Sequence, residues 1–103
     1  MTGYVAVLRI DLHFPEVASL KGKRSELKAV KAGLAQRFGA DVSEVDHHDI
    51  WQRSTLLACV CSGTWTRIEE RCDAIGRWLD VRLPQGVTIS RRVASWTDLE
   101  SIG

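Results

Sequence analysis

The stretch "YVAVLRIDLHF" (residues 4–14) decides how the fold begins, because apolar residues occupy every second position in it. Successive side chains of an extended chain point to opposite faces, so this alternation predicts a strand with one face in the core. The predicted core-facing set is Tyr4, Ala6, Leu8, Ile10, Leu12 and Phe14. Pro15 ends the strand, since proline has no N–H to donate to a neighbouring strand.

Residues 19–38, "SLKGKRSELKAVKAGLAQRF", change to helical spacing. Ser19 is a suitable N-cap, and Gly39 suits the left-handed conformation that ends many helices. The side chains that recur at helical intervals predict the buried side of this helix: Leu20, Leu27, Val30, Leu34 and Phe38.

Two further strands follow this helix. Residues 41–49 form a weaker and more polar strand, which suits the edge of a sheet and is a candidate for a bulge. Residues 54–62, "STLLACVCS", are apolar on both faces, as expected of a central strand.

A second helix and a last strand complete the chain. Either Thr64 or Thr66 caps the helix, and Thr66 with Glu69 fits a capping box. Its predicted buried side is Trp65, Ile68, Cys72, Ile75 and Leu79. The sequence "LPQG" (83–86) ends the helix, and residues 87–95 form the last strand.

The resulting order, β-α-β-β-α-β, predicts an α+β fold of the ferredoxin-like type. Crossovers between neighbouring strands are right-handed, so both helices should cover one face of a four-stranded antiparallel sheet. A chain of 103 residues is expected to form a single domain over residues 1–103.

Composition excludes several classes of protein. Hydrophobic residues are 45% and charged residues 26% of the chain, which is typical of soluble globular proteins. No apolar run reaches the roughly 18 residues of a membrane span, and Arg9 and Asp11 interrupt the only apolar stretch near the N-terminus. We therefore expect a cytoplasmic protein with no membrane contact. Its three cysteines form no CxxC motif, so we expect buried thiols and no disulfide framework.

Residues 44–53, "EVDHHDIWQR", concentrate acidic and imidazole groups. In a strand, neighbouring side chains of 46–49 point to opposite faces and cannot converge as four ligands, and a tight metal site needs three or four donors. We therefore expect no metal there. Three interpretations of this stretch remain open. It is an exposed charged edge strand, a hairpin anchored by its tryptophan, or a partner-binding loop. The partner loop would comprise Asp46, His47, Asp49, Trp51, Gln52 and Arg53.

No motif for catalysis or for a cofactor is visible. The chain has no GxGxxG or GxxxxGK[ST] sequence and no nucleophile elbow. Glu69 and Glu70 are adjacent, so on a helix their side chains diverge. We expect a protein that is not an enzyme and needs no cofactor.

The helix over residues 19–38 carries six cations and one anion, a net charge of +5, while the rest of the chain carries −4. Cations in the first turn face the positive end of the helix dipole, at a cost of about 0.3–1 kcal/mol each. Bound phosphate would relieve this conflict. The predicted phosphate contacts are Lys21, Lys23, Arg24, Lys28 and Lys31. The alternative is a basic helix that is merely solvated.

The helix-free sheet face is the second candidate surface. We expect it to carry Val5 and Val7, with Leu56, Ala58 and Val60 as further candidates. So apolar a face is a natural site for a homodimer. It offers no aromatic residues for stacking bases, which argues against sequence-specific RNA reading on the sheet.

Four motifs in order resemble the YlxP-like family of small bacterial proteins of unknown function: "SLKGKR" (19–24), "RF" (37–38), "EVDHHD" (44–49) and "WQR" (51–53). The resemblance implies a ferredoxin-like fold. It also implies a role near RNA or the ribosome, because genes of the family commonly lie beside those for translation initiation and ribosome maturation. His48, where the family has glutamine, and "GTWT" (63–66) depart from the pattern.

Together these observations predict a cytoplasmic accessory protein that binds RNA or a ribosomal subunit through the backbone. The alternative is a homo-oligomeric protein–protein adaptor without nucleic-acid binding.

Overall fold

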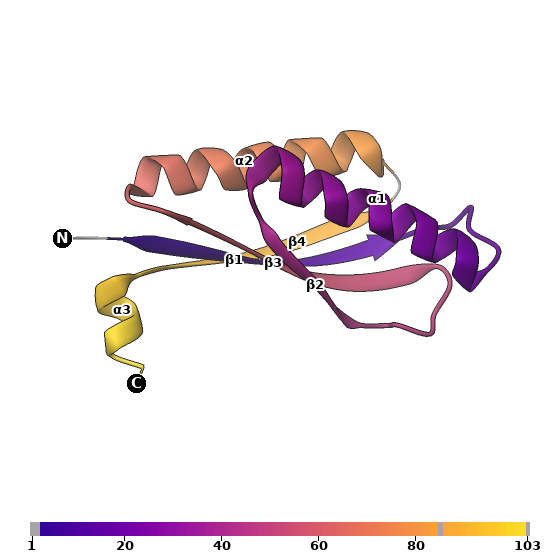
Figure 1. Cartoon of the computed structure of the whole chain (residues 1–103), viewed down its shortest axis with the longest axis horizontal. Helices are drawn as coiled ribbons and strands as arrows, with labels where there is room; N and C mark the ends of the chain where they lie inside the picture. Colours follow the sequence, from indigo (N-terminus) through magenta and orange to yellow (C-terminus); the bar gives the residue numbers. More distant parts are fainter. Residues whose placement is uncertain (1–2, 85, 103) are drawn as a thin grey trace.

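The computed structural model describes residues 3–84 and 86–102 as a two-layer α+β domain (Figure 1). Four strands form one antiparallel sheet in the order β2-β3-β1-β4: β1 (Tyr4–His13), β2 (Asp41–Asp46), β3 (Arg53–Ser62) and β4 (Val87–Ser95). The helices are α1 (Leu20–Phe38), α2 (Trp65–Arg82) and α3 (Trp96–Glu100). This order confirms the predicted ferredoxin-like fold.

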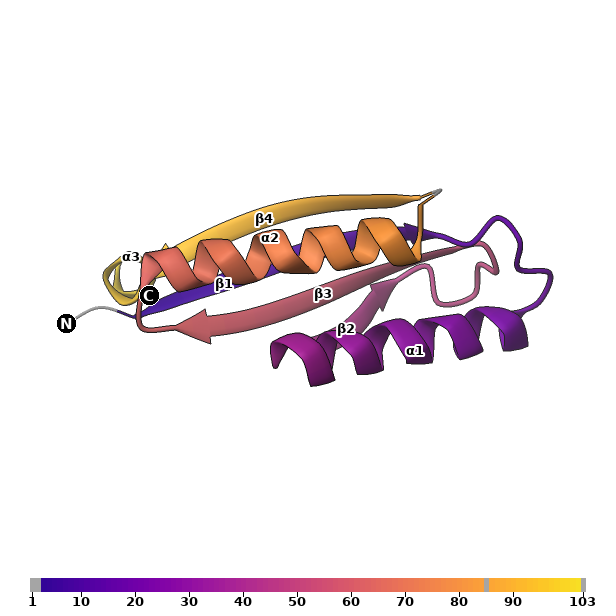
Figure 2. The same ribbon diagram turned by 90° about the horizontal axis from the view of Figure 1, so that it is seen from above.

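The two long helices lie side by side on one face of the sheet (Figures 1 and 2). Helix α2 runs above β1, β3 and β4, whereas α1 runs beside the edge strand β2. The short helix α3 hangs from the end of β4 on the opposite side of the sheet. None of the helices in the described part of the chain is long and apolar enough to cross a membrane.

The core lies between the helices and the inward side of the sheet. The predicted face of β1 is confirmed, since Ala6, Leu8, Ile10, Leu12 and Phe14 are all buried. They pack with α1 and α2 residues and with the inward residues of β3, which are Leu56, Ala58 and Val60. These three β3 residues were expected as candidates for the helix-free face, and that expectation is wrong. The register pairs Leu56 with Ile10 and Ala58 with Leu8, so they share the inward face.

The helix ends follow the local sequence with one exception. Ser19 caps α1 by accepting a hydrogen bond from the Gly22 backbone, and Gly39 ends it in the left-handed conformation with φ of 64°. In α2 the N-cap is Thr64, which accepts from the Arg67 backbone. The predicted capping box between Thr66 and Glu69 is therefore wrong, because the helix begins earlier than that motif requires.

Several predicted details differ in the structure. Trp65, expected on the buried side of α2, is half exposed and packs edge-on against Tyr4. Strand β2 ends at Asp46, with a bulge between Glu44 and Asp46, so residues 47–49 belong to a loop. Helix α3 was not predicted.

The close approach of α1 and α2 is centred on Gly33. A Cβ atom at Gly33 would lie 2.4 Å from the ring of Trp78 on α2. That ring is already held by Phe38 edge-on and by the guanidinium groups of Arg37 and Arg82. Only glycine therefore lets the two helices meet in this way.

We expect Gly33→Ala to lower the free energy of unfolding by about 1–3 kcal/mol, because the added methyl group overpacks a filled contact. Gly22→Ala in the same helix is the matched control, since its Cβ would meet atoms only at 3.5 Å. That control should raise stability by up to about 1 kcal/mol through helix propensity. Urea unfolding measures both, and stabilisation by Gly33→Ala would contradict the packing described here.

Candidate nucleic-acid interface

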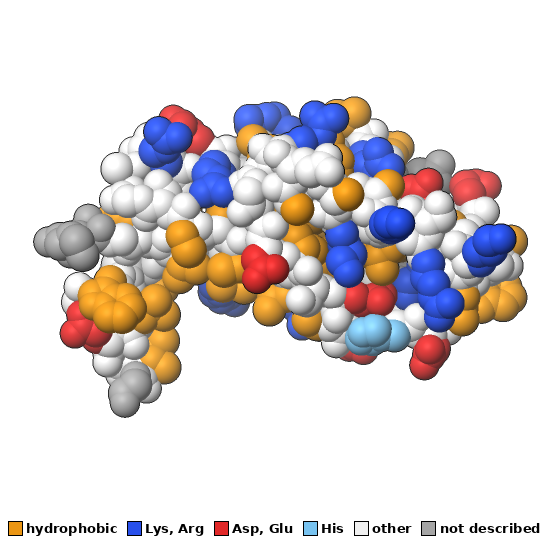
Figure 3. Space-filling model, in the orientation of Figure 1, with side chains coloured by type: hydrophobic (Ala, Val, Ile, Leu, Met, Phe, Trp, Pro, Cys, Tyr) orange, Lys and Arg blue, Asp and Glu red, His pale blue; other side chains and the backbone are white. Residues whose placement is uncertain are grey.

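Four cations of α1 recur at helical spacing beside its buried side, and we call them the basic surface: Lys21, Arg24, Lys28 and Lys31. Lys21, Arg24 and Lys28 are exposed and Lys31 is half-buried. Figure 3 shows Lys and Arg side chains gathered over α1. None of the four lies within 4 Å of an acidic group in the part of the chain that the structure describes.

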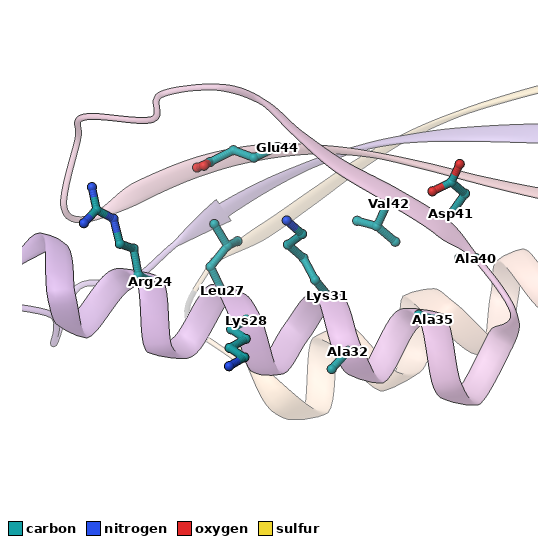
Figure 4. A pocket seen from close by; sticks show the side chains of 10 residues that line it. All are labelled: Arg24, Leu27, Lys28, Lys31, Ala32, Ala35, Ala40, Asp41, Val42 and Glu44. Atoms are coloured by element: carbon teal, nitrogen blue, oxygen red, sulfur yellow. The ribbon is translucent and has the colours of Figure 1, made fainter.

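A groove of about 550 Å³ separates α1 from β2 (Figure 4). Leu27 and Val42 supply apolar walls. Arg24 and Lys31 point toward β2, whereas Lys28 points away from the strand. Asp41 lies toward the carboxyl end of α1, away from Arg24. Glu44 also lines the end of the groove near Arg24, where its carboxylate is paired with Lys23. Among the described residues, the cations without an acidic partner at that end are therefore Arg24 and Lys28.

Lys23 is not part of this surface. The structure buries it, with 1% of its side chain exposed, and its Nζ donates to the carbonyl oxygens of His47 at 2.5 Å and His48 at 3.2 Å. The same Nζ lies 3.2 Å from Glu44 Oε2, which also accepts a hydrogen bond from Ser54 Oγ at 2.5 Å. The prediction of Lys23 as a phosphate contact is corrected accordingly, because its charge is neutralised inside the fold.

A sequence signal for this burial exists. Lys23 stands on the apolar side of α1, three residues after Leu20 and four before Leu27. Glu44 is the inward-facing residue of β2 opposite Leu56. A cation and an anion on two facing apolar surfaces form a pair, since a buried charge without a partner is strongly unfavourable. Helical spacing alone could therefore have separated Lys23 from its basic neighbours.

The carboxyl group of Glu44 responds to opposing influences. Partial burial acts to raise its pKa, but the hydrogen bonds from Ser54 and Lys23 and the positive charge of Lys23 outweigh it. The pKa of Glu44 therefore lies below its ordinary value of 4.5. The folded state holds this carboxylate ionised more firmly than the unfolded chain does.

The loop over residues 47–52 is held by its own backbone and by the sheet. His47 has a positive φ of 63°, and its carbonyl also accepts from Ile50 N. His47 Nδ1 lies 2.9 Å from Thr55 Oγ1, which donates to Asp11 Oδ1 at 2.6 Å. Asp46 Oδ1 accepts from His47 N, and this hydrogen bond is the main cause that lowers the pKa of Asp46. These polar groups shape the turn.

The other residues of the predicted partner loop divide into two kinds. Gln52 ties the loop to the segment before α1, since its side chain donates to the Pro15 carbonyl and its own carbonyl accepts from Phe14 N. Trp51 is 51% exposed, so it does not anchor the hairpin as one alternative required. Asp49 and Arg53 are also exposed. Whether this loop binds a partner stays a prediction.

Metal-binding groups do not converge in residues 3–84 and 86–102, where no three His, Cys, Asp or Glu side chains are placed to hold an ion. The thiols differ from one another. Cys72 is buried and Cys59 half-buried, and burial raises the pKa of both. Cys61 is exposed, contrary to the expectation that all three are buried.

Fold and surface together define a small ferredoxin-like α+β domain with a basic helix beside an open groove. The chain belongs to the family described as "Protein of unknown function (DUF503)", which matches residues 5–92. This finding confirms the resemblance seen in the sequence motifs. The family description assigns no function.

Two further proteins are similar to this chain. The "Uncharacterized protein YlxP" of Bacillus subtilis (strain 168) is 26% identical over 65 residues, which covers 63% of this chain and 71% of that protein. A solved structure, "De novo designed protein Foldit4", superposes with a TM-score of 0.55 at 13% identity. That match covers 89% of this chain and 96% of the designed one, and it bears on the fold alone.

Removing the buried ammonium should destabilise the fold strongly. We expect Lys23→Met to lower the free energy of unfolding by about 3–5 kcal/mol, because it leaves Glu44 partly buried without its cation. Lys28→Met is the matched control in the same helix, where an exposed lysine should change stability by about 0.5 kcal/mol or less. Equal stability of the two variants in chemical denaturation would refute the structural role of Lys23.

The lowered pKa of Glu44 predicts a specific pH dependence. Its contribution to stability is present above the unfolded-state pKa and is lost as the pH falls through the folded-state pKa. We expect Glu44→Gln to flatten the loss of stability between about pH 5 and pH 3. Glu70→Gln, an exposed change on α2, should keep the wild-type profile. The measurement is urea unfolding across this range, and identical profiles for wild type and Glu44→Gln would contradict the assignment.

Proposed function

We propose that this protein is a non-enzymatic cytoplasmic accessory protein that binds RNA or a ribosomal particle through the basic surface of α1. The observation that carries the proposal is the set of α1 cations that have no acidic partner among the described residues. Other cations of the fold have acidic partners, as Arg82 does with Glu26 and Arg91 with Glu69 and Asp73. What distinguishes α1 is that the four cations of the basic surface follow one another along a single helix.

Electrostatics favours an anionic partner at this surface. The overall charge is only +1, so attraction depends on the local excess of cations along α1 and not on the protein as a whole. A phosphate backbone suits such a surface because its charges repeat along a line. From Arg24 to Lys31 the helix rises about 10 Å, which matches roughly three stacked nucleotides.

The chemistry of the groove supports backbone recognition over base reading. Beside the cations, its walls are mostly Leu27, Val42 and alanine side chains, which offer no donors or acceptors for base edges. Of the two carboxylates in the lining, Glu44 is already engaged by Lys23 and Ser54, and Asp41 lies at the far end of the groove from Arg24. The sheet face used by other ferredoxin-like RNA-binding proteins would need exposed aromatics on its central strands. On the described outward positions of β1 and β3 there is no Phe, Tyr or Trp, and the one imidazole, His13, stands at the end of β1.

A non-enzymatic role fits the polar cluster on the sheet. The chain of Asp11, Thr55 and His47 contains the residue types of a catalytic triad, but the hydroxyl lies between the other two groups. Thr55 is fully buried, so its oxygen has no room for a substrate. The cluster accounts for the shape of the loop and needs no reaction to explain it.

The test compares two double variants that remove the same charge. We expect Arg24→Ala with Lys28→Ala to weaken binding of a short single-stranded RNA at least tenfold at low salt. The dependence of log affinity on log salt should become shallower by about 1.4, near 0.7 for each lost phosphate contact. Arg67→Ala with Arg77→Ala, two exposed arginines of α2, is the control and should leave both values nearly unchanged.

Fluorescence anisotropy and co-sedimentation with ribosomal subunits measure the effect. Wild-type protein that shows no RNA or subunit binding at about 50 mM salt, where phosphate contacts are strong, would overturn the proposal. That result would favour the alternative of a protein–protein adaptor. Equal losses in both double variants would indicate non-specific charge attraction and would also count against a defined site on α1.

A further inference from the structure

The helix-free side of the sheet, with α3 beside it, is a second surface, which we call the open face. We propose that it binds a second copy of this chain, forming a two-fold symmetric dimer. The inference does not depend on RNA binding, since α1 lies on the other side of the sheet (Figure 1).

One half of the open face is apolar. Strand register pairs Val5 with Cys61 and Val7 with Cys59, and Leu57 follows on β3 opposite Arg9. Leu57 is 39% exposed and Cys61 is exposed. Apolar side chains on a solvated sheet face are normally covered, and the described parts of this chain cover these only in part, since Val5, Val7 and Cys59 are half-buried.

Helix α3 extends the same apolar surface. Ser95 and Asp98 hold it in a capping box, so its conformation is well defined. Its large apolar side chains are nevertheless exposed, Trp96 by 59% and Leu99 by 38%. Both line a hollow of about 560 Å³ whose other walls include Tyr4, Val5 and Cys61. An ordered helix that presents its apolar side chains beside an apolar sheet suits a protein contact.

The area of the open face is sufficient for a dimer. Four strands spaced by about 4.8 Å, of ten, six, ten and nine residues at about 3.3 Å each, give roughly 550 Å² of sheet on each copy. Two such faces together, before α3 is added, pass the roughly 1,000 Å² that separates specific interfaces from incidental contacts.

Charge placement selects a second copy as the occupant. One row across the sheet reads Asp41, Cys59, Val7 and Arg92, from β2 to β4. If the two-fold axis runs parallel to the strands, β2 lies over the partner's β4. Each row of residues across the sheet then faces the same row of the partner. Asp41 then faces the partner's Arg92 at both edges, with apolar side chains between them. Such a face is complementary to itself, as an isologous interface requires.

The other symmetric arrangement is unfavourable. An axis perpendicular to the strands lays β2 over the partner's β2 and reverses the rows. It brings Asp41 near the partner's Asp46, which places like charges together. The geometry therefore points to the axis parallel to the strands.

Sedimentation velocity of the full chain without nucleic acid tests the dimer. We expect a dimer at tens of micromolar for the wild type. Val7→Asp should weaken association at least a hundredfold, because it places an unpaired carboxylate at the centre of the contact. Val81→Asp is the matched control on α2, where the valine is 84% exposed, and it should dimerise like the wild type. A monomeric wild type at 200 µM, roughly the limit of a weak contact, would overturn the proposal, as would a fully dimeric Val7→Asp.

Two further measurements keep the test independent of one variant. Alkylation of Cys61 in the wild type should slow as protein concentration rises, whereas a rate independent of concentration would count against burial of this face. Asp41→Arg and Arg92→Asp should each weaken the dimer at least tenfold, and the double variant should recover affinity to near the wild-type value. Failure of the double variant to recover would overturn the proposed axis.

Discussion

The ammonium group of Lys23 is the interaction on which the rest of the structure depends. It enters the seam between α1 and β2, where it meets the Glu44 carboxylate and two backbone carbonyls of the loop that follows β2. A single side chain thus fixes the position of a helix, an edge strand and a loop relative to one another. As the edge strand of the described sheet, β2 pairs with one neighbour only, β3, and the Lys23 contacts join both this strand and the loop after it to α1.

This contact also shows that some residues of the family motifs serve the fold. The sequence around Lys23 and the acidic stretch around Glu44 are far apart in the chain, but they meet in the structure. Part of the loop motif serves the turn, through His47 and Thr55. What remains free for a partner is the rest of the basic helix and the exposed tip of the loop with Trp51. A family motif can therefore contain a residue that serves the fold beside one whose side chain stays available to a partner.

The two candidate surfaces lie on opposite sides of the sheet. The basic surface belongs to the helical layer, while the open face belongs to the bare side with α3 (Figure 1). A dimer through the open face would leave both copies of α1 pointing outward. Two basic helices on one particle would engage one RNA at two places, and such bivalence raises affinity without any new contact. The two proposals are therefore compatible in space, and each can fail without the other.

Much of the fold could be predicted because it depends on local patterns. The alternation of apolar and polar residues predicted β1. Helical spacing, with the caps Ser19 and Gly39, predicted α1. The order of the elements then predicted the observed sheet topology. The prediction was wrong where both faces of a segment carry similar residues. Strand β3 is apolar on either side, so alternation could not decide whether Leu56 or Leu57 faces the core. Helix α3 was missed because five residues are too few to show a period.

The sequence by itself determined the order of the elements, the ferredoxin-like fold, the excess of cations on α1 and the membership suggested by its motifs. Only the tertiary structure decided which of those cations are available. Lys23 and Arg24 are neighbours of the same charge, but one points into the core and the other toward the groove. The reason is physical: helical spacing puts Lys23 on the apolar side of α1, but the anion that makes its burial possible, Glu44, comes from a distant strand, and only packing places the two opposite each other.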